Sequence, residues 1–340
     1  HIVAHGSDPR ISGLAQGCSQ IVLPYDPEGR DFEPRRVAMF FGLVAGLLGY
    51  YRHIVVLDTD EFLVAAPDCA PARDLAGYLE AAKRAVDAGR EVFVDKLGAA
   101  PALHKGPGDF ATEADLAIEQ ILREQLTAAT GIAVYGEEQG GAFDPAACWV
   151  VDPIDGTSNY SSGNPNCAIL CTLMLDGAPV VAITDAPLLD MRLTAIDGGQ
   201  VMLNDDPLPP VNADTAAAAQ VGIGSLASAD RQRFPASFRL DLAGALTESH
   251  LRPRISGSVG VDLAFVAQGI YQAAVSFSPH IWDNAAGVLF ARCAGATVSG
   301  LDGAAWTPQT SGVVVGTGRA HRTVMDAIGK STRGGTADEA

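Results

Sequence analysis

Three apolar runs between residues 148 and 184 constrain the fold of this chain more than any other feature. CWVVD, CAILCTLML and PVVAIT each have the length and composition of a buried strand. Asp176 and Gly177 separate the second run from the third, and Asp-Gly between apolar runs is a strong signal for a two-residue hairpin. With a further strand expected at IAVY, the sequence predicts that the core begins as an antiparallel meander.

Helical patterns frame this meander. Apolar residues from Leu75 to Leu97 follow a helical period, and Gly98 is a natural stop. A second helix is expected after Thr112, whose spacing to Asp115 resembles a capping box. The sequence therefore predicts two helices before the first strand of the main body. Beyond Asn204, expected helices near 230–248, 258–269, 282–293 and at the end alternate with strands at AQVGIG, QAAVSFS and GVVVG, as in layered folds.

Composition narrows the classes of partner. The 340 residues carry 23 Lys and Arg against 40 Asp and Glu, a formal charge of -17, which repels nucleic acid and anionic membranes. The most apolar stretch, Val37 to Tyr51, is shorter than the roughly 20 residues needed to span a bilayer. Six cysteines without a CxxC pair predict buried free thiols and a cytoplasmic location. The missing initiator Met and signal pattern suggest a fragment or a processed product.

The segment WVVDPIDGTSNY carries the most chemistry. An apolar strand runs directly into Asp152 and Asp155, and Pro153 between them is expected to fix a turn in which the two carboxylates converge. Gly156 and Thr157 are expected to open a helix whose amides bind an oxyanion. The combination suits a metal and phosphate site. On this segment alone, a plain Asp-Pro-x-Asp-Gly surface turn stays open as the alternative.

Three further segments support the site. GEE at 136–138, WVVDPIDGTSN and IWDNAAG at 281–287 resemble, in order and spacing, the signature motifs of the inositol monophosphatase family. KGPGDFATEAD at 105–115 resembles the N-terminal motif of that family, and the resemblance covers about residues 73–330. It implies an α/β (α+β) fold, the layered αβαβα architecture of sugar phosphatases, with the active site where the two halves meet. It also implies a phosphoric monoester hydrolase that is lithium-sensitive and forms a homodimer.

The resemblance assigns metal ligands. Glu137, Asp152 and the backbone carbonyl of Ile154 match the first magnesium site, and Asp152, Asp155 and Asp283 match the second. A third, weaker ion near Glu137 would bring the total to two to three Mg²⁺ per site. All these ligands are hard oxygen atoms, which Mg²⁺ prefers.

The resemblance also assigns catalytic and substrate-binding residues. Asp115 and Thr157 match the pair that orients and deprotonates the attacking water, so no covalent phosphoenzyme is expected, and Glu137 completes the catalytic set. The residues implied in substrate binding are Asp155, Gly156, Thr157, Gly257, Ser258, Val259, Ser276 and Asp283.

The resemblance implies that the substrate is a small phosphorylated metabolite, with inositol 1-phosphate favoured. Inositol-specific members of the family have a glutamate seven residues before the WD aspartate, where this chain has Ser276. A short neutral side chain holds sugar hydroxyls less selectively than a carboxylate does. Histidinol phosphate, fructose 1,6-bisphosphate and adenosine 3′,5′-bisphosphate are therefore alternatives.

Residues 1–68 differ in character from the rest. SQIVLP, a helix opened by Pro34 and HIVVLDTDEFLV form a strand, helix, strand unit, which resembles a fragment of a family 2 type glycosyltransferase. Asp58 and Asp60 would be its metal ligands, but the fragment is too short for a nucleotide-sugar domain and is interpreted as an inactive remnant. For the whole chain, a glycosyltransferase and a non-catalytic binding protein are the rival hypotheses.

The expected organisation has four parts. They are an N-terminal extension at 1–68, an α+β half with the metal site at 73–210, a C-terminal α/β half that completes the site at 211–330, and a disordered polar tail at 331–340.

Overall fold

A computed structural model describes residues 74–106, 109–211, 219–227 and 233–334, together with four short strands before residue 74. The chain divides into two compact units, His1–Asp74 and Leu75–Ala340. In the first unit, the described strands form one sheet in the order β2-β1-β4-β3, in which β1 and β2 are parallel. These strands are β1 (Ile2–His5), β2 (Gln20–Leu23), β3 (Ile54–Val56) and β4 (Leu63–Ala65).

The predicted strands of the first unit overlap β2, β3 and β4. The helix expected at Pro34 and the acids Asp58 and Asp60 lie outside the described residues. The glycosyltransferase resemblance therefore stays a prediction.

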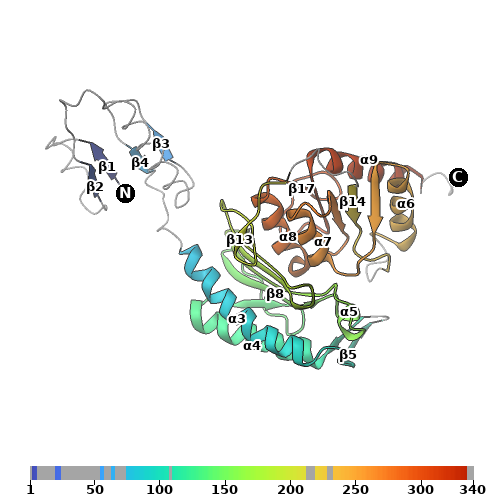
Figure 1. Ribbon diagram of the computed structural model, residues 1–340, viewed down its shortest axis with the longest axis horizontal. Coiled ribbons are helices and arrows are strands. Elements are labelled where there is room, and N and C mark those ends of the chain that lie inside the picture. Colours follow the sequence, from blue (N-terminus) through green and yellow to red (C-terminus); the bar gives the residue numbers. More distant parts are fainter. Residues whose placement is uncertain are drawn as a thin grey trace. The chain divides into compact units, whose positions relative to one another are not determined.

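Two helices form one of the two outer layers of the second unit (Figure 1). Helix α3 (Leu75–Asp95) lies beside α4 (Glu113–Thr130), and both contact the first large sheet. The Thr112 hydroxyl accepts a hydrogen bond from the Ala114 amide, while the Asp115 carboxylate accepts one from the Thr112 amide at 2.7 Å. The predicted capping box at the start of α4 is thus confirmed.

The first large sheet has seven strands in the order β13-β12-β11-β10-β9-β8-β7. They are β7 (Val134–Gly136), β8 (Ala147–Asp155), β9 (Ala168–Leu175), β10 (Ala178–Ala186), β11 (Met191–Ile196), β12 (Met202–Leu203) and β13 (Asp206–Pro207). Asp176 and Gly177 have φ of 49° and 71°, which confirms the predicted hairpin. The meander begins one strand later than expected, because β7 pairs with β8 in parallel.

The second sheet has five strands in the order β15-β14-β16-β18-β17. They are β14 (Ala219–Gly222), β15 (Leu251–Arg254), β16 (Ala273–Ser276), β17 (Thr297–Ser299) and β18 (Val313–Gly316). Helices α6 (Ala236–Thr247) and α9 (Gly318–Gly334) cover its outer face.

Helices α7 (Val259–Ala267) and α8 (Ile281–Cys293) lie between the two sheets (Figure 1). Buried side chains of both helices pack against each sheet in turn, so the central layer is apolar on both sides. The order of layers is helices, sheet, helices, sheet, helices. This confirms the predicted αβαβα architecture.

Two local expectations need correction. The helices α3 and α4 are separated by a hairpin of β5 (Pro101–Gly106) and β6 (Asp109–Thr112), so two helices do not directly precede the first strand. All of β5 is exposed, and it therefore lacks the apolar alternation by which a strand is recognised. Helix α9 continues to Gly334, into the expected polar tail, and the Ser331 hydroxyl donates to the Ala327 carbonyl in its last turns.

Among the described cysteines, Cys148, Cys167 and Cys171 are buried and Cys293 is half-buried, and all four are free thiols, as the sequence predicted. No helix in the described ranges is long and apolar enough to cross a membrane.

Helix α6 offers a matched test of the outer layer that covers the second sheet. Leu242 is fully buried against the second sheet, whereas Leu240 on the same helix is 55% exposed. We expect Leu242→Ala to lower the free energy of unfolding by about 2–5 kcal/mol and Leu240→Ala to change it by less than about 0.5 kcal/mol. Urea unfolding followed by tryptophan fluorescence measures both, because the three tryptophans (149, 282 and 306) belong to the second unit. Equal losses in the two variants would contradict the layer order.

Candidate active site

A bulge at the end of β8 brings Asp152 and Asp155 together. Residues three apart on a regular strand point to opposite faces of the sheet. Here Asp152 is opposite Leu170 and Asp155 is opposite Ala168, so β8 has one residue more than β9 over this stretch. The extra residue turns both carboxylates toward the same side. Pro153 lies within the bulge, where a missing backbone N–H is tolerated.

Two carboxylates from elsewhere meet Asp152. Glu137 directly follows β7, and its amide donates to the Val151 carbonyl of β8 at 3.3 Å. Asp283 lies in the first turn of α8. Ligand oxygens of Glu137, Asp152 and Asp283 lie within 4.8 Å of one another, which is a separation that one divalent cation can bridge.

Asp155 is held by the start of α7. Its Oδ2 accepts hydrogen bonds from the Ser258 hydroxyl and from the Gly260 amide at 2.6 Å, and its Oδ1 accepts one from the Val259 amide at 3.3 Å. Ser258 is also the N-cap of α7, since its hydroxyl accepts from the Val261 amide at 3.2 Å. The expected substrate loop therefore lies directly against a carboxylate of the bulge.

Two glycines allow this close approach. Gly156 has φ of 85°, and a Cβ there would lie 2.9 Å from the Asn166 carbonyl oxygen. Gly257 has φ of 80°, and a Cβ there would lie 3.0 Å from the Asn159 amide nitrogen. The Asn159 side chain also donates to the Ser256 carbonyl at 2.8 Å, which ties the short helix α5 (Thr157–Ser161) to the loop before α7.

Asp115 reaches the same site from α4. Its Oδ2 accepts from the Thr112 amide and hydroxyl, at 2.7 and 2.6 Å. Its Oδ1 lies 3.3 Å from the Thr157 hydroxyl, which is also 3.1 Å from the Ile154 carbonyl oxygen. Capping of α4 therefore orients the carboxylate toward Thr157.

Burial and crowding raise the pKa values of three carboxylates, Asp152, Asp155 and Asp283. Burial, and then the charges of Glu137, Asp155 and Asp283, raise the pKa of Asp152 well above its usual range. Burial and the charges of Glu137 and Asp155 raise the pKa of Asp283 to about 8. Burial raises the pKa of Asp155 to about 6, although the Ser258 hydrogen bond opposes the rise. Such a set of buried oxygens is favourable only with protons or cations among them, so the donor set fits divalent metal ions.

Three residues that shape the site were given no role by the sequence, namely Lys105, Glu119 and Arg123. The Lys105 ammonium lies 2.8 Å from Glu137 Oε1 and 2.6 Å from Glu138 Oε1. The buried Glu119 carboxylate accepts from the amides of residues 138 and 139 and from the Arg123 guanidinium, and so fixes the loop after β7. The signal for Glu119 was a glutamate in the apolar stripe of a helix, four residues before an arginine.

The hydrogen bond of the Ser276 hydroxyl is with its own local turn and not with the carboxylate cluster. It ends β16 and is buried, and its hydroxyl accepts a hydrogen bond from the Ser278 amide at 3.2 Å. The hydroxyl is thus used by the local turn that leads to α8. The expected contact between Ser276 and substrate stays a prediction.

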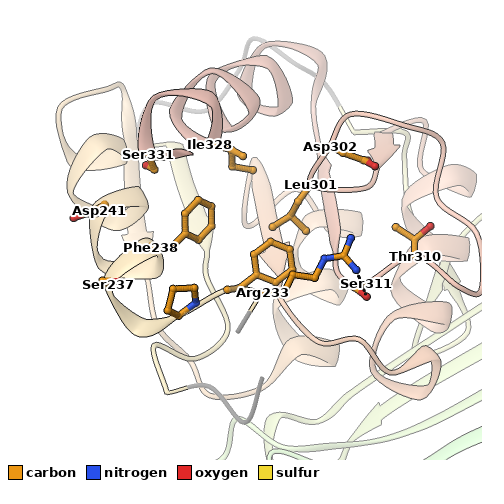
Figure 2. A pocket seen from close by; sticks show the side chains of 12 residues that line it. Arg233, Ser237, Phe238, Asp241, Leu301, Asp302, Thr310, Ser311, Ile328 and Ser331 are labelled. Atoms are coloured by element: carbon orange, nitrogen blue, oxygen red, sulfur yellow. Dashed lines mark hydrogen bonds between the residues drawn. The ribbon is translucent and has the colours of Figure 1, made fainter. Parts of the chain in front are cut away.

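A cavity in the described part of the chain lies away from these residues (Figure 2). It measures about 530 Å³ and lies where α6, α9 and the loop after β17 meet, with Phe238 and Leu301 in its wall. None of its lining residues belongs to the carboxylate cluster. The candidate site is therefore defined by its charged groups and not by this cavity.

This arrangement of motifs has counterparts in known proteins. A family model described as the inositol monophosphatase family matches residues 72–333. The chain belongs to this family. A probable inositol 1-monophosphatase, ImpA, of Mycobacterium tuberculosis (strain ATCC 25618 / H37Rv) is 43% identical over 256 residues, which cover 75% of this chain and 95% of that protein. The histidinol-phosphatase of the same strain is 32% identical over 219 residues, covering 64% and 84%.

Solved structures agree on the fold. An inositol monophosphatase from Anabaena (Nostoc) sp. PCC 7120 superposes with a TM-score of 0.66 at 25% identity, covering 76% of this chain and 97% of that structure. Family membership makes the chain a phosphoric monoester hydrolase that acts on a small phosphorylated metabolite, in a metal-dependent family.

The raised pKa values predict how pH affects the metal-free protein. Above about pH 4, the folded chain keeps protons that the unfolded chain has released, on Asp155 up to about pH 6 and on Asp283 up to about pH 8. These groups therefore make the free energy of unfolding fall as pH rises through that window. We expect the melting temperature in EDTA to fall less steeply in Asp283→Asn than in the native chain.

Mg²⁺ should reduce this loss, because a ligand that binds only the folded state stabilises it. Circular dichroism melts at pH 5, 6.5 and 8, with EDTA or with Mg²⁺, measure the effect. The same pH slope in the native chain and in Asp283→Asn would contradict the assignment of the raised pKa to this group.

Proposed function

We propose that the chain is a Mg²⁺-dependent phosphomonoesterase of a small phosphorylated polyol or sugar, with inositol 1-phosphate the favoured substrate. The observation that carries the proposal is the meeting of Glu137, Asp152 and Asp283, whose oxygens lie within 4.8 Å of one another. Each comes from a different element, and no packing need of the fold explains three carboxylates at one point. A shared cation does.

Two ions would share Asp152. Glu137, Asp152 and the Ile154 carbonyl would hold the first, and Asp152, Asp155 and Asp283 the second, with a weaker third near Glu137. Bound there, Mg²⁺ would supply Lewis-acid activation and charge neutralisation for phosphoryl transfer. Asp155 is supported by its bonds from Ser258 and Gly260, which leave it little freedom to turn away.

Asp115 and Thr157 would activate the attacking water. The Thr157 hydroxyl donates toward Asp115 Oδ1, so its lone pairs can accept a proton from water. As water gives a proton to Thr157 Oγ1, the threonine proton passes to Asp115, whose pKa burial raises. The resulting hydroxide forms the new P–O bond while the ester P–O bond breaks, and the leaving oxygen takes its proton from solvent.

The rest of the site would position the phosphate ester. Backbone amides at Gly156 and Thr157, at the start of α5, would donate to phosphate oxygens, and Gly257–Val259 would contact the alcohol part. The match to ImpA favours inositol 1-phosphate. The buried Ser276 and the match to a histidinol-phosphatase keep histidinol phosphate as the second candidate, ahead of fructose 1,6-bisphosphate and adenosine 3′,5′-bisphosphate.

The same proposal covers how the chain is divided and assembled. Residues 73–210 would supply most of the metal ligands, and residues 211–330 would complete the site with Asp283 and the Gly257 loop. A homodimer, lithium inhibition and a cytoplasmic location accompany this reading, and the extension at 1–68 would take no part in turnover.

Phosphate release tests the proposal. With saturating Mg²⁺, we expect turnover of one or more of the four candidate esters. Asp152→Asn should lower it by far more than the roughly 10- to 100-fold that loss of a supporting contact costs, because the shared ligand is removed. Asp241→Asn, an exposed carboxylate on α6, is the matched control and should leave turnover unchanged.

Two outcomes would count against the function. Full activity of Asp152→Asn at saturating Mg²⁺ would remove the metal assignment. Binding of Mg²⁺ without turnover of any ester would favour a non-catalytic binding protein.

A further inference from the structure

Lys105 contacts the carboxylate cluster at Glu137. The residue lies on β5, and its ammonium is 2.8 Å from Glu137 Oε1 and 2.6 Å from Glu138 Oε1. The side chains of Lys105 and Glu137 are 22% and 23% exposed, whereas that of Glu138 is 1% exposed. The ammonium is therefore held between one carboxylate of the cluster and one next to it.

The two carboxylates that contact Lys105 differ in their relation to the metal cluster. Glu137 belongs to the group of three carboxylates that can share an ion, and Glu138 does not. Glu138 is also fixed, because its amide donates to Glu119 Oε2 at 2.7 Å. Glu138 can thus retain the ammonium after Glu137 has been released.

A divalent ion and an ammonium cannot both lie against the Glu137 carboxylate without repelling each other. The lysine side chain is long and flexible, and its charge is a single point that can move between acceptors. Binding of the ion is then an exchange, in which Lys105 gives up Glu137 and keeps Glu138.

We propose that Lys105 is a built-in competitor for the metal site, which pairs with both Glu137 and Glu138 until a divalent ion displaces it from Glu137 and leaves it on Glu138. The inference rests on the proposed metal site and concerns how tightly that site holds its ion. Lys105 lowers the affinity for the ion and Glu138 restores part of it.

Metal binding in the absence of substrate tests this exchange. Mn²⁺ is titrated into the full, metal-stripped chain at low ionic strength, and room-temperature electron paramagnetic resonance counts the free ion. We expect Lys105→Met to bind roughly 3- to 30-fold more tightly than the native chain, which lies within the range of couplings between contacting charges. Glu138→Gln should bind several-fold more weakly, because Lys105 then has only Glu137 as a charged partner.

The double variant separates the exchange from a general effect of charge. If Glu138 acts by holding Lys105, then Glu138→Gln has no effect in the Lys105→Met background. If Glu138 acts only through its field, it weakens binding equally in both backgrounds, and the proposal is overturned. Lys96→Met is the matched control, since Lys96 pairs with Glu113 at 3.5 Å outside the cluster, and it should bind Mn²⁺ as the native chain does.

The outcomes also distinguish this inference from the proposed function. A native chain that binds no Mn²⁺ would remove the metal site and the exchange together. A native chain that binds Mn²⁺, with Lys105→Met binding equally or more weakly, would overturn the exchange alone. Melting curves of each variant in EDTA identify any variant that has failed to fold.

Discussion

Repulsion among buried and half-buried carboxylates is the constraint on which the active-site end of this fold depends. Asp152 and Asp155 come from one strand, Glu137 directly follows a second strand, and Asp283 comes from a helix between the sheets. Burial and the neighbouring charges raise the pKa values of Asp152 and Asp283, so the cluster opposes folding unless protons or cations neutralise it. The surrounding structure holds the carboxylates in place against this repulsion.

Backbone features supply much of that support. The bulge in β8 turns two acids to one side, and the cap of α7 donates to Asp155 through Ser258. Gly136 lets the loop after β7 lie against Glu119, where a Cβ would be 2.3 Å from the carboxyl group. These features place atoms from both halves of the second unit around one point. They explain why the site lies where the layers meet.

Much of the site could be predicted from the sequence because its signals are local. The Asp176 turn, the Thr112 cap and the convergence of Asp152 with Asp155 depend on neighbouring residues, and each is present in the structure. The β5–β6 hairpin and the Lys105 ion pairs could not be predicted in this way. An exposed strand has no apolar period, and the partners of Lys105 are more than 30 residues away in the chain. Recognition of the family motifs identified the residues but not the contacts between them.

The central claim is that the cluster of Glu137, Asp152 and Asp283 is a divalent metal site. Anomalous diffraction from crystals of the full chain soaked in Mn²⁺ tests it most directly. The account predicts manganese peaks bounded by these carboxylates, with Asp152 shared between two of them. Crystals in which Mn²⁺ binds only elsewhere, while the cluster remains without a peak and Lys105 still contacts Glu137, would contradict it.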